Sequence, residues 1–136
     1  MSSQNDASVG GSGLPDYLGI SISEVGHSFA RGGFEVRPHH LAPHGYLHAA
    51  SVVALMDSAC GFGCQASLPE GANSFTTIEL KANYLGTARS GVVTCEALMA
   101  HGGRNTQVWD AKAVHVETGK VIALFRCTQM ILYPRG

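Results

Sequence analysis

The chain carries one hydrophobic stretch of helical length and several shorter stretches that alternate in the manner of strands. From about His48 to Ala66 small and apolar residues follow one another without a proline, which predicts a helix of about five turns. Pro69 and the Glu70-Gly71 turn close this stretch. Because it is apolar on nearly all faces, we expect a helix that is surrounded by protein.

Two glycines, Gly61 and Gly63, interrupt the predicted helix. Each glycine costs a helix roughly 1 kcal/mol relative to alanine. We therefore expect the helix backbone to approach another element closely at these two positions.

Strands are predicted on both sides of this helix. Before it, a helical turn at 15–18 leads into a strand that ends near Glu24, and a second strand lies between His27 and Val36. Four more strands are expected after the helix, at Phe75–Leu85, Gly91–Ala100, Thr106–Val116 and Val121–Leu132. Short turns join these four, which predicts an antiparallel meander.

This order of elements indicates an α+β fold in which one antiparallel sheet curls around a central helix. The free edge of such a sheet is commonly paired with a second copy of the chain. At 136 residues the chain is one domain of ordinary size. Residues 1–13, MSSQNDASVGGSG, are small and polar and predict a disordered N-terminal arm, so the expected domain is 14–136.

Composition narrows the classes of function. Charged residues make up 14% of the chain and the net charge is −1 with no run of like charges, so we expect no nucleic-acid partner. This low share of charge suggests that another copy or a partner covers part of the surface. No apolar run reaches the ~20 residues of a membrane span and no signal peptide is recognised, so we expect no membrane partner and a cytoplasmic location. The four cysteines are expected to be free thiols.

Four of the seven histidines lie within ten residues, at positions 39, 40, 44 and 48. On a helix His40, His44 and His48 would share one face and could bind zinc. Pro43 and Gly45 disfavour a helix there, and no acidic residue stands where a metalloprotease needs its base. We therefore expect no metal and interpret these histidines as loop residues near the mouth of a site.

Asp57 is the only acidic or basic residue between Ala49 and Ala66. An ionised carboxylate in such a helix is costly unless it is paired or hydrogen-bonded. Its neighbours on the same face are very small apart from Val53, which leaves room for a thin substrate, and desolvation would raise the pKa of Asp57. A purely structural role, with the carboxylate bonded to backbone groups, fits the sequence equally well.

The helix start adds a second element of a site. His48-Ala49-Ala50-Ser51 would leave backbone N–H groups unpaired at the positive end of the helix dipole. Such a terminus can hold an oxyanion. Together with a carboxylate two turns further along, it favours acyl transfer.

At these residues the sequence resembles the hotdog-fold thioesterases, specifically the PaaI-type and 4-hydroxybenzoyl-CoA thioesterase group, from about Tyr17 to Pro134. The family motif runs from an Asn or Gln to a Gly, then to His-Gly-Gly and, seven residues later, to an Asp or Glu in the helix. Gly45, His48-Ala49-Ala50 and Asp57 fall on this frame. The segments 76–85 and 102–110 resemble the third and fifth strands of the family.

The resemblance implies a hotdog fold and an acyl-CoA thioesterase that releases the free acid and CoA. Asp57 would act as general base or nucleophile. The N–H of Ala49, next to His48, would polarise the thioester carbonyl from the other subunit, and Thr77 would lie near the attacking water. Active sites would lie at the interface of a homodimer, which often pairs again into a homotetramer. Coenzyme A would be part of the substrate, and no cofactor is implied.

Four further positions match places that contact the CoA phosphates in related enzymes or lie in a nearby turn: Arg89, Arg104, Asn105 and Arg135. The aromatic residues Phe62, Phe75 and Tyr46 are compatible with an aromatic acyl group.

The sequence departs from the family pattern at two places. Ala49-Ala50 replaces the two glycines of the motif, which preserves the backbone N–H. Ala42 stands where the family has Asn or Gln, and His40 or His44 is the candidate replacement. The alternative functions are a hotdog enoyl-CoA hydratase or dehydratase and a non-catalytic acyl-CoA-binding protein.

Overall fold

A computed structural model describes residues 13–135. It begins with one helical turn, α2 (Leu14–Tyr17), and two strands, β2 (Ser21–Gly26) and β3 (Phe29–Glu35). A short 3-10 turn, η1 (Pro38–His40), precedes the long helix α3 (Ala49–Ala66). Four longer strands complete the order, namely β4 (Ser74–Tyr84), β5 (Val92–Gly102), β6 (Thr106–His115) and β7 (Lys120–Leu132). The predicted helix and strands are all present, while the predicted arm 1–13 lies, except for Gly13, outside the described residues.

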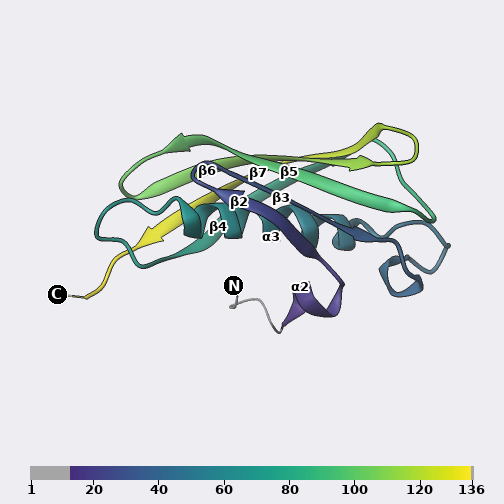
Figure 1. Cartoon of the computed structure of the whole chain (residues 1–136), viewed down its shortest axis with the longest axis horizontal. Helices are drawn as coiled ribbons and strands as arrows, with labels where there is room; N and C mark the ends of the chain where they lie inside the picture. Colours follow the sequence, from purple (N-terminus) through teal and green to yellow (C-terminus); the bar gives the residue numbers. More distant parts are fainter. Residues whose placement is uncertain (1–12, 136) are drawn as a thin grey trace.

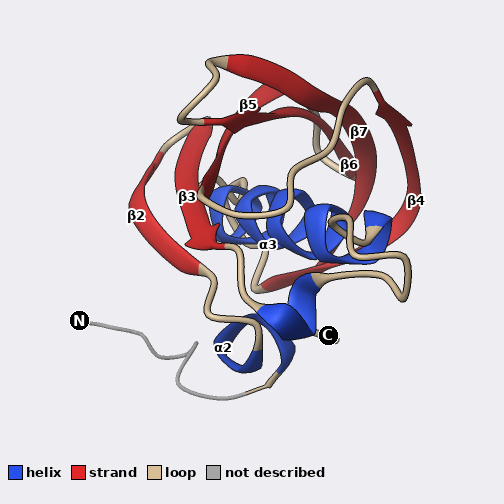
Figure 2. Cartoon of the chain, turned by 90° about the vertical axis from the view of Figure 1, so that its right-hand side faces the viewer, coloured by secondary structure: helices blue, strands red, loops and turns tan. Residues whose placement is uncertain are grey.

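The six described strands form one antiparallel sheet in the order β2-β3-β5-β6-β7-β4. Figure 1 shows the long strands running above α3, and Figure 2 shows the sheet curling around the helix with α2 on the open side. The predicted α+β architecture, one curled sheet around one long helix, is therefore confirmed.

The predicted meander is correct only for β5, β6 and β7. β4 does not pair with β5; it pairs with β7 at the far edge, from Ser74 opposite Leu132 to Tyr84 opposite Ala123. β5 pairs instead with β3, from Phe29 opposite Leu98 to Glu35 opposite Val92. The 85–91 connection is too long to impose a tight hairpin, so the chain can cross the open end of the sheet between β4 and β5.

Helix α3 packs directly against the sheet where it has glycines. A Cβ on Gly63 would lie 2.5 Å from Cη2 of Trp109, and a Cβ on Gly61 would lie 3.3 Å from Cζ of Phe75. Trp109 is fully buried, and its indole Nε1 donates to Gln107 Oε1 at 2.7 Å. The close approach predicted at both glycines is confirmed.

One side of α3 is not enclosed, which corrects the prediction of a helix surrounded by protein. The sheet covers only part of the helix circumference, and the remaining face is half-exposed in the single chain. That face consists of Val53, Ala54, Asp57, Ser58, Gly61 and Phe62. The only charged residue of the helix therefore lies on its open side.

Strand β4 forms one edge of the sheet, beside this open face. Its apolar residues Ile78, Leu80 and Tyr84 are 52%, 43% and 45% exposed. The register with β7 shifts between Thr77 and Glu79, so Ile78 is the extra residue of a β-bulge. A bulge moves the alternation by one residue, which lets Thr77 face the helix although Ala82 also packs against the core. A long apolar edge of this kind favours association with another chain.

Two further expectations concern cysteines and membranes. All four cysteines are free thiols, as predicted, and all four are buried. Neither helix in residues 13–135 combines the length and hydrophobicity that a bilayer crossing requires.

Candidate active site

The first residues of α3 leave one backbone donor available. His48 is the N-cap with extended backbone, and its Nδ1 accepts the Ala50 N–H at 2.9 Å. The carbonyl of His48 accepts the Ser51 N–H at 3.0 Å. Within residues 13–135 no acceptor is hydrogen-bonded to the N–H of Ala49. This N–H lies at the positive end of the helix dipole and is available to an acceptor.

His40 holds the start of α3 in place through hydrogen bonds of its side chain and its carbonyl. It is buried, its Nδ1 accepts the Arg37 N–H at 2.8 Å, and its Nε2 lies 2.6 Å from the Leu18 carbonyl oxygen. These partners require the neutral tautomer that carries its proton on Nε2, and burial lowers the pKa of His40 in agreement. Its carbonyl accepts from the His48 N–H and from the Ser51 hydroxyl, both at 2.9 Å. His40 is a structural anchor, so it does not replace the amide missing at Ala42.

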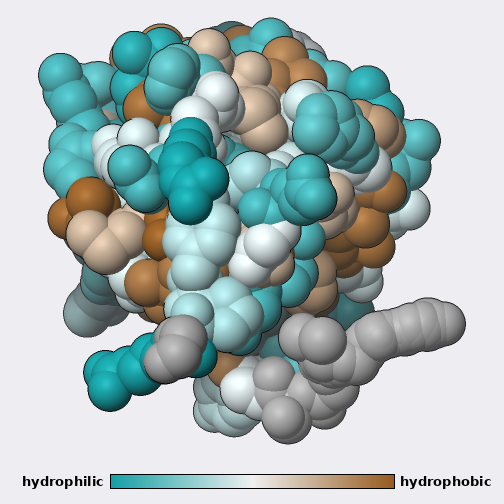
Figure 3. All heavy atoms as spheres, turned by 90° about the vertical axis from the view of Figure 1, so that its left-hand side faces the viewer, coloured by the Kyte–Doolittle hydropathy of each residue, from teal (hydrophilic) through white to brown (hydrophobic). Residues whose placement is uncertain are grey.

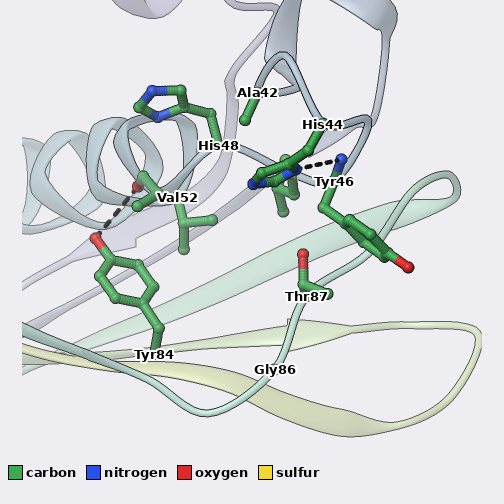
Figure 4. A pocket seen from close by; sticks show the side chains of 10 residues that line it. Ala42, His44, Tyr46, His48, Val52, Tyr84, Gly86 and Thr87 are labelled. Atoms are coloured by element: carbon green, nitrogen blue, oxygen red, sulfur yellow. Dashed lines mark hydrogen bonds between the residues drawn. The ribbon is translucent and has the colours of Figure 1, made fainter.

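A cleft of about 580 Å³ opens at the helix start. Figure 4 shows His44 and Tyr46 on one side of it, and Tyr84 and the first turn of α3 on the other. His44 Nδ1 accepts the Tyr46 N–H at 3.2 Å, and the Tyr84 hydroxyl donates to the Ala49 carbonyl at 3.3 Å. The lining residues are Ala42, His44, Tyr46, Leu47, His48, Ala49, Val52, Tyr84, Gly86 and Thr87. Of the two candidate replacements, His44 is therefore the one that reaches the cleft.

Asp57 lies two turns further along α3, in a different cavity. This cavity, of about 380 Å³, runs between α3 and β4 and is lined by Pro15, Asp57, Ser58, Gly61, Phe62, Gln65, Phe75 and Thr77. Burial raises the pKa of the Asp57 carboxyl, and the neighbouring Thr77 hydroxyl opposes this shift. Oδ1 of Asp57 is buried without a hydrogen-bond partner in the described chain. Such a carboxyl is suited to take up a proton from a water or to attack a substrate.

Thr77 makes a hydrogen bond that the sequence interpretation missed. Its hydroxyl donates to Oε1 of Gln129 on β7 at 2.6 Å. Gln129 is fully buried, and its Nε2 points to the Cys127 thiol at 3.6 Å. The signal in the sequence was a glutamine on the buried side of β7, between the core residues Cys127 and Ile131.

The two parts of the predicted site do not meet within one chain. The cleft at Ala49 and the cavity at Asp57 have no lining residue in common. His48 borders the cleft and caps the helix, whereas Thr77 borders the cavity beside Asp57. The geometry of one chain thus provides an oxyanion donor and a carboxylate at separate places.

The predicted CoA contacts lie at opposite ends of the molecule. Arg89 is at the end where α3 begins, with its guanidinium 5.1 Å from the centre of the Tyr46 ring. Arg104 lies 5.4 Å from the centre of the Tyr133 ring at the other end, where the Tyr133 hydroxyl donates to the Arg104 carbonyl. Asn105, whose carbonyl accepts the Ile131 N–H, and the exposed Arg135 belong to this end, near the C-terminus in Figure 1. Arg89 therefore does not join the other three within one chain, which corrects the expectation of neighbouring turns.

The C-terminal end of the molecule is largely polar at its centre. Figure 3 shows hydrophilic side chains over the middle of this end and apolar side chains at its flanks. Residues 13–135 contain no group of three or more His, Cys, Asp or Glu side chains arranged to hold a metal ion.

Comparison with known proteins gives one consistent result. The model of the thioesterase superfamily matches residues 44–122. A 1,4-dihydroxy-2-naphthoyl-CoA hydrolase of Listeria monocytogenes is 35% identical over 116 residues, which cover 85% of this chain and 93% of that protein.

Solved structures agree with this result. A thioesterase of Haemophilus influenzae superposes with a TM-score of 0.80 at 30% identity and covers 88% of this chain and 82% of its own. A mutant of the phenylacetic acid degradation protein PaaI of Thermus thermophilus superposes with a TM-score of 0.79 at 26% identity, covering 87% and 97%. The curled sheet and central helix of this chain are the hotdog fold that these proteins share.

Proposed function

The chain belongs to the thioesterase superfamily and is a thioester hydrolase; we propose that its substrates are acyl-CoA thioesters and that Asp57 and the Ala49 N–H carry the reaction. The observation behind this proposal is a pair of unsatisfied groups on one helix. Asp57 has a buried oxygen without a partner, and Ala49 has a backbone N–H without an acceptor in the described chain.

The chemistry follows from these two groups. Asp57 accepts a proton from water while the water oxygen attacks the thioester carbonyl carbon. The carbonyl oxygen becomes an oxyanion and accepts a hydrogen bond from the Ala49 N–H. The carbonyl then re-forms as the bond between carbon and sulfur breaks, and the leaving sulfur takes the proton from Asp57, which releases CoA thiol and the free acid and regenerates the carboxylate. The raised pKa of Asp57 supports a role as base, because a carboxylate that holds its proton more tightly is a better proton acceptor.

A second copy of the chain would bring the two groups together. The apolar edge of β4 is exposed, and it lies beside the half-exposed face of α3 that carries Asp57. Two β4 edges that pair antiparallel around a two-fold axis also place the two α3 helices antiparallel. The start of one helix then faces the open side of the other. We propose a homodimer of this form, alone or paired into a homotetramer.

The same arrangement accounts for the divided CoA contacts. In an antiparallel dimer, the end of one subunit that carries Arg89 lies beside the opposite end of its partner. Arg104, Asn105 and Arg135 lie at that opposite end. These basic groups would then flank one CoA from two subunits, with the cleft at Ala49 between them. Their separation in the single chain is thus what a shared site requires.

An aromatic acyl group fits the cavity beside Asp57. Phe62 and Phe75 line it, and only Asp57 among its lining residues carries a charge. A relative is named for the hydrolysis of 1,4-dihydroxy-2-naphthoyl-CoA. We propose a compact aryl acyl-CoA as the preferred substrate. A panel of aryl and aliphatic acyl-CoA thioesters tests this, with the highest kcat/KM expected for an aryl compound.

The role of Asp57 is tested with Asp57→Asn, which removes the base and keeps the side-chain shape. We expect turnover on the best acyl-CoA to fall by about 10²–10⁴-fold, the usual contribution of a general base. Ser58→Ala is the matched control because Ser58 lines the same cavity, and it should retain activity within a few fold. Wild-type turnover by Asp57→Asn in the wild-type oligomer would contradict the proposal. So would enoyl-CoA hydration, assayed alongside, in place of thioester cleavage.

A further inference from the structure

Gln129 is a buried polar side chain that is hydrogen-bonded to Thr77, which lines the same cavity as Asp57. It lies on the inner face of β7, directly opposite Thr77 on β4. Its side chain is fully buried, so an unbonded amide there would cost stability. Oε1 accepts the Thr77 hydroxyl at 2.6 Å, and Nε2 faces the weak acceptor Sγ of Cys127 at 3.6 Å. This orientation fixes the carbonyl side of the amide toward Thr77.

The Thr77 hydroxyl has a single proton and two neighbouring acceptors. One acceptor is Oε1 of Gln129, and the other is the Asp57 carboxyl on α3, which lines the same cavity and has a buried oxygen without a partner in the described chain. While the proton is directed to Gln129, the Thr77 hydroxyl stabilises the ionised Asp57 carboxylate only weakly, and burial remains the larger effect on the pKa of this carboxyl.

In the described chain, few other titratable groups lie near Asp57. Its titratable neighbours are Cys60 on its own helix and, behind Cys60, Cys127 on β7. Helix α2 contributes Pro15 and strand β4 contributes Phe75 and Thr77, none of which is charged. Ser58 and Gln65 of α3 also line the cavity and are uncharged, and Thr77 is the neighbour whose hydroxyl opposes the effect of burial on the pKa of Asp57.

We propose that Gln129 is a positioning residue for catalysis. It holds the Thr77 proton away from Asp57, so that the carboxyl remains a strong acceptor for the proton of the attacking water. The inference rests on the proposed function of Asp57, and it adds a residue on a third element, β7, to the parts that set the activity of the site.

The variant Gln129→Leu tests this in the full-length protein. Without Oε1 the Thr77 hydroxyl can turn and donate to the Asp57 carboxylate, which stabilises the ionised form. We expect the titration midpoint of the Asp57 carboxyl, followed by ¹³C NMR, to move to lower pH by about one to two units, the size of one hydrogen bond to a charged group. The acid limb of the pH profile of kcat/KM should move with it. The plateau should fall several fold because the carboxylate becomes a weaker base.

Two comparisons separate positioning from general damage. In a Thr77→Val background the further change Gln129→Leu should leave the midpoint where Thr77→Val alone puts it, since the hydroxyl is already gone. Gln107→Leu is the matched control on the same inner face. Gln107 is also buried and lies opposite Gln129, but it bonds to Trp109 and the Ser67 carbonyl. Gln107→Leu should lower the free energy of unfolding without moving the titration midpoint of the Asp57 carboxyl.

A midpoint that stays in place or rises in Gln129→Leu would overturn the inference. If Gln129→Leu does not fold, Gln129→Met, which keeps the length of the side chain and lacks the acceptor oxygen, takes its place with the same expected direction. The NMR titration needs no substrate, so it reports on Gln129 even if Asp57→Asn keeps its turnover. Failure of the proposed function and failure of this inference therefore give different results.

Discussion

Ala49 and Asp57 each have a polar group that the fold does not pair, although potential partners are close. His48 uses its imidazole for the N–H of Ala50 and its carbonyl for Ser51, and neither reaches Ala49. Thr77 gives its proton to Gln129 rather than to Asp57. Unpaired groups of this kind cost stability, so their presence at two points of one helix indicates a binding role.

Ala49→Pro should separate the backbone donor from the helix that carries it. Proline is well tolerated at the first position of a helix, and the extended backbone of His48 suits a following proline. Only the N–H is lost, so kcat should fall by about 10²–10³-fold, as for loss of one oxyanion donor. Steady-state kinetics measures the fall in kcat, and circular dichroism checks that the helix is intact. Ala49→Gly, which keeps the N–H, should remain active, and equal loss in both variants would contradict the role of the donor.

Asp57→Asn should make the protein more stable at neutral pH. Burial raises the pKa of Asp57 above its ordinary value of 3.8, so the folded chain binds this proton more tightly than the unfolded chain. Ionisation therefore weakens the wild-type fold as the pH rises from 3.8 through the raised pKa. Asparagine does not ionise, and its advantage in urea unfolding should shrink as the pH falls toward 3.8. An advantage that is constant with pH would show that burial of the charge is not its cause.

At the scale of residues, the sequence identified Asp57 and Ala49 as candidates because a lone charge and a helix start are visible in the pattern itself. The role of His40 could not be found, because it depends on contacts with Arg37 and Leu18 that only the folded loop creates. Gln129 was missed because its partner Thr77 belongs to a strand more than forty positions earlier in the chain, and the pairing of β4 with β7 was not predicted.

The fit of α3 against the sheet gives a prediction at the scale of elements. Gly63→Ala would place a methyl group 2.5 Å from the buried Trp109 ring, which cannot turn without losing its bond to Gln107. We expect a loss of about 1–3 kcal/mol in the free energy of unfolding, as for other overpacked cores, despite the better helix propensity of alanine. Urea denaturation measures this.

Gly61→Ala is the control on the same helix. Its methyl group would lie 3.3 Å from Phe75, which is only partly buried and can shift. Stability should stay within about 1 kcal/mol of wild type, because helix propensity offsets the tighter contact. A larger loss at Gly61 than at Gly63 would contradict this account of the packing.

Elements were predicted more reliably than their arrangement. The length of α3 and the alternation in β6 and β7 are local properties, and the structure reproduces them within a few residues. The sequence does not predict the bulge at Ile78, because the pattern from Phe75 to Leu85 indicates one strand with unbroken alternation. The place of β4 at the far edge follows from closure of the sheet around the helix, which is a property of the whole chain.

A shared site can be tested at the scale of the whole molecule by mixing two inactive proteins. Asp57→Asn and Ala49→Pro each damage both sites of a homodimer, but a mixed dimer has one site with neither change and one with both. Random exchange of subunits makes about half of the dimers mixed, so we expect recovery of about a quarter of wild-type activity. Activity after unfolding and refolding the mixture measures this. No recovery, with mixed dimers present by mass spectrometry, would show that each chain works alone.

The four buried cysteines also allow the rate of unfolding to be measured without an added label. Cys60, Cys64, Cys95 and Cys127 are all out of reach of solvent in the native chain. Burial raises the pKa of Cys64 and of Cys95 to about 12, so these thiols are protonated as well as hidden. A thiol reagent can then modify them only after α3 leaves the sheet. The rate at which unmodified protein takes up an alkylating agent should thus report how often the hotdog opens, with no label added to the protein.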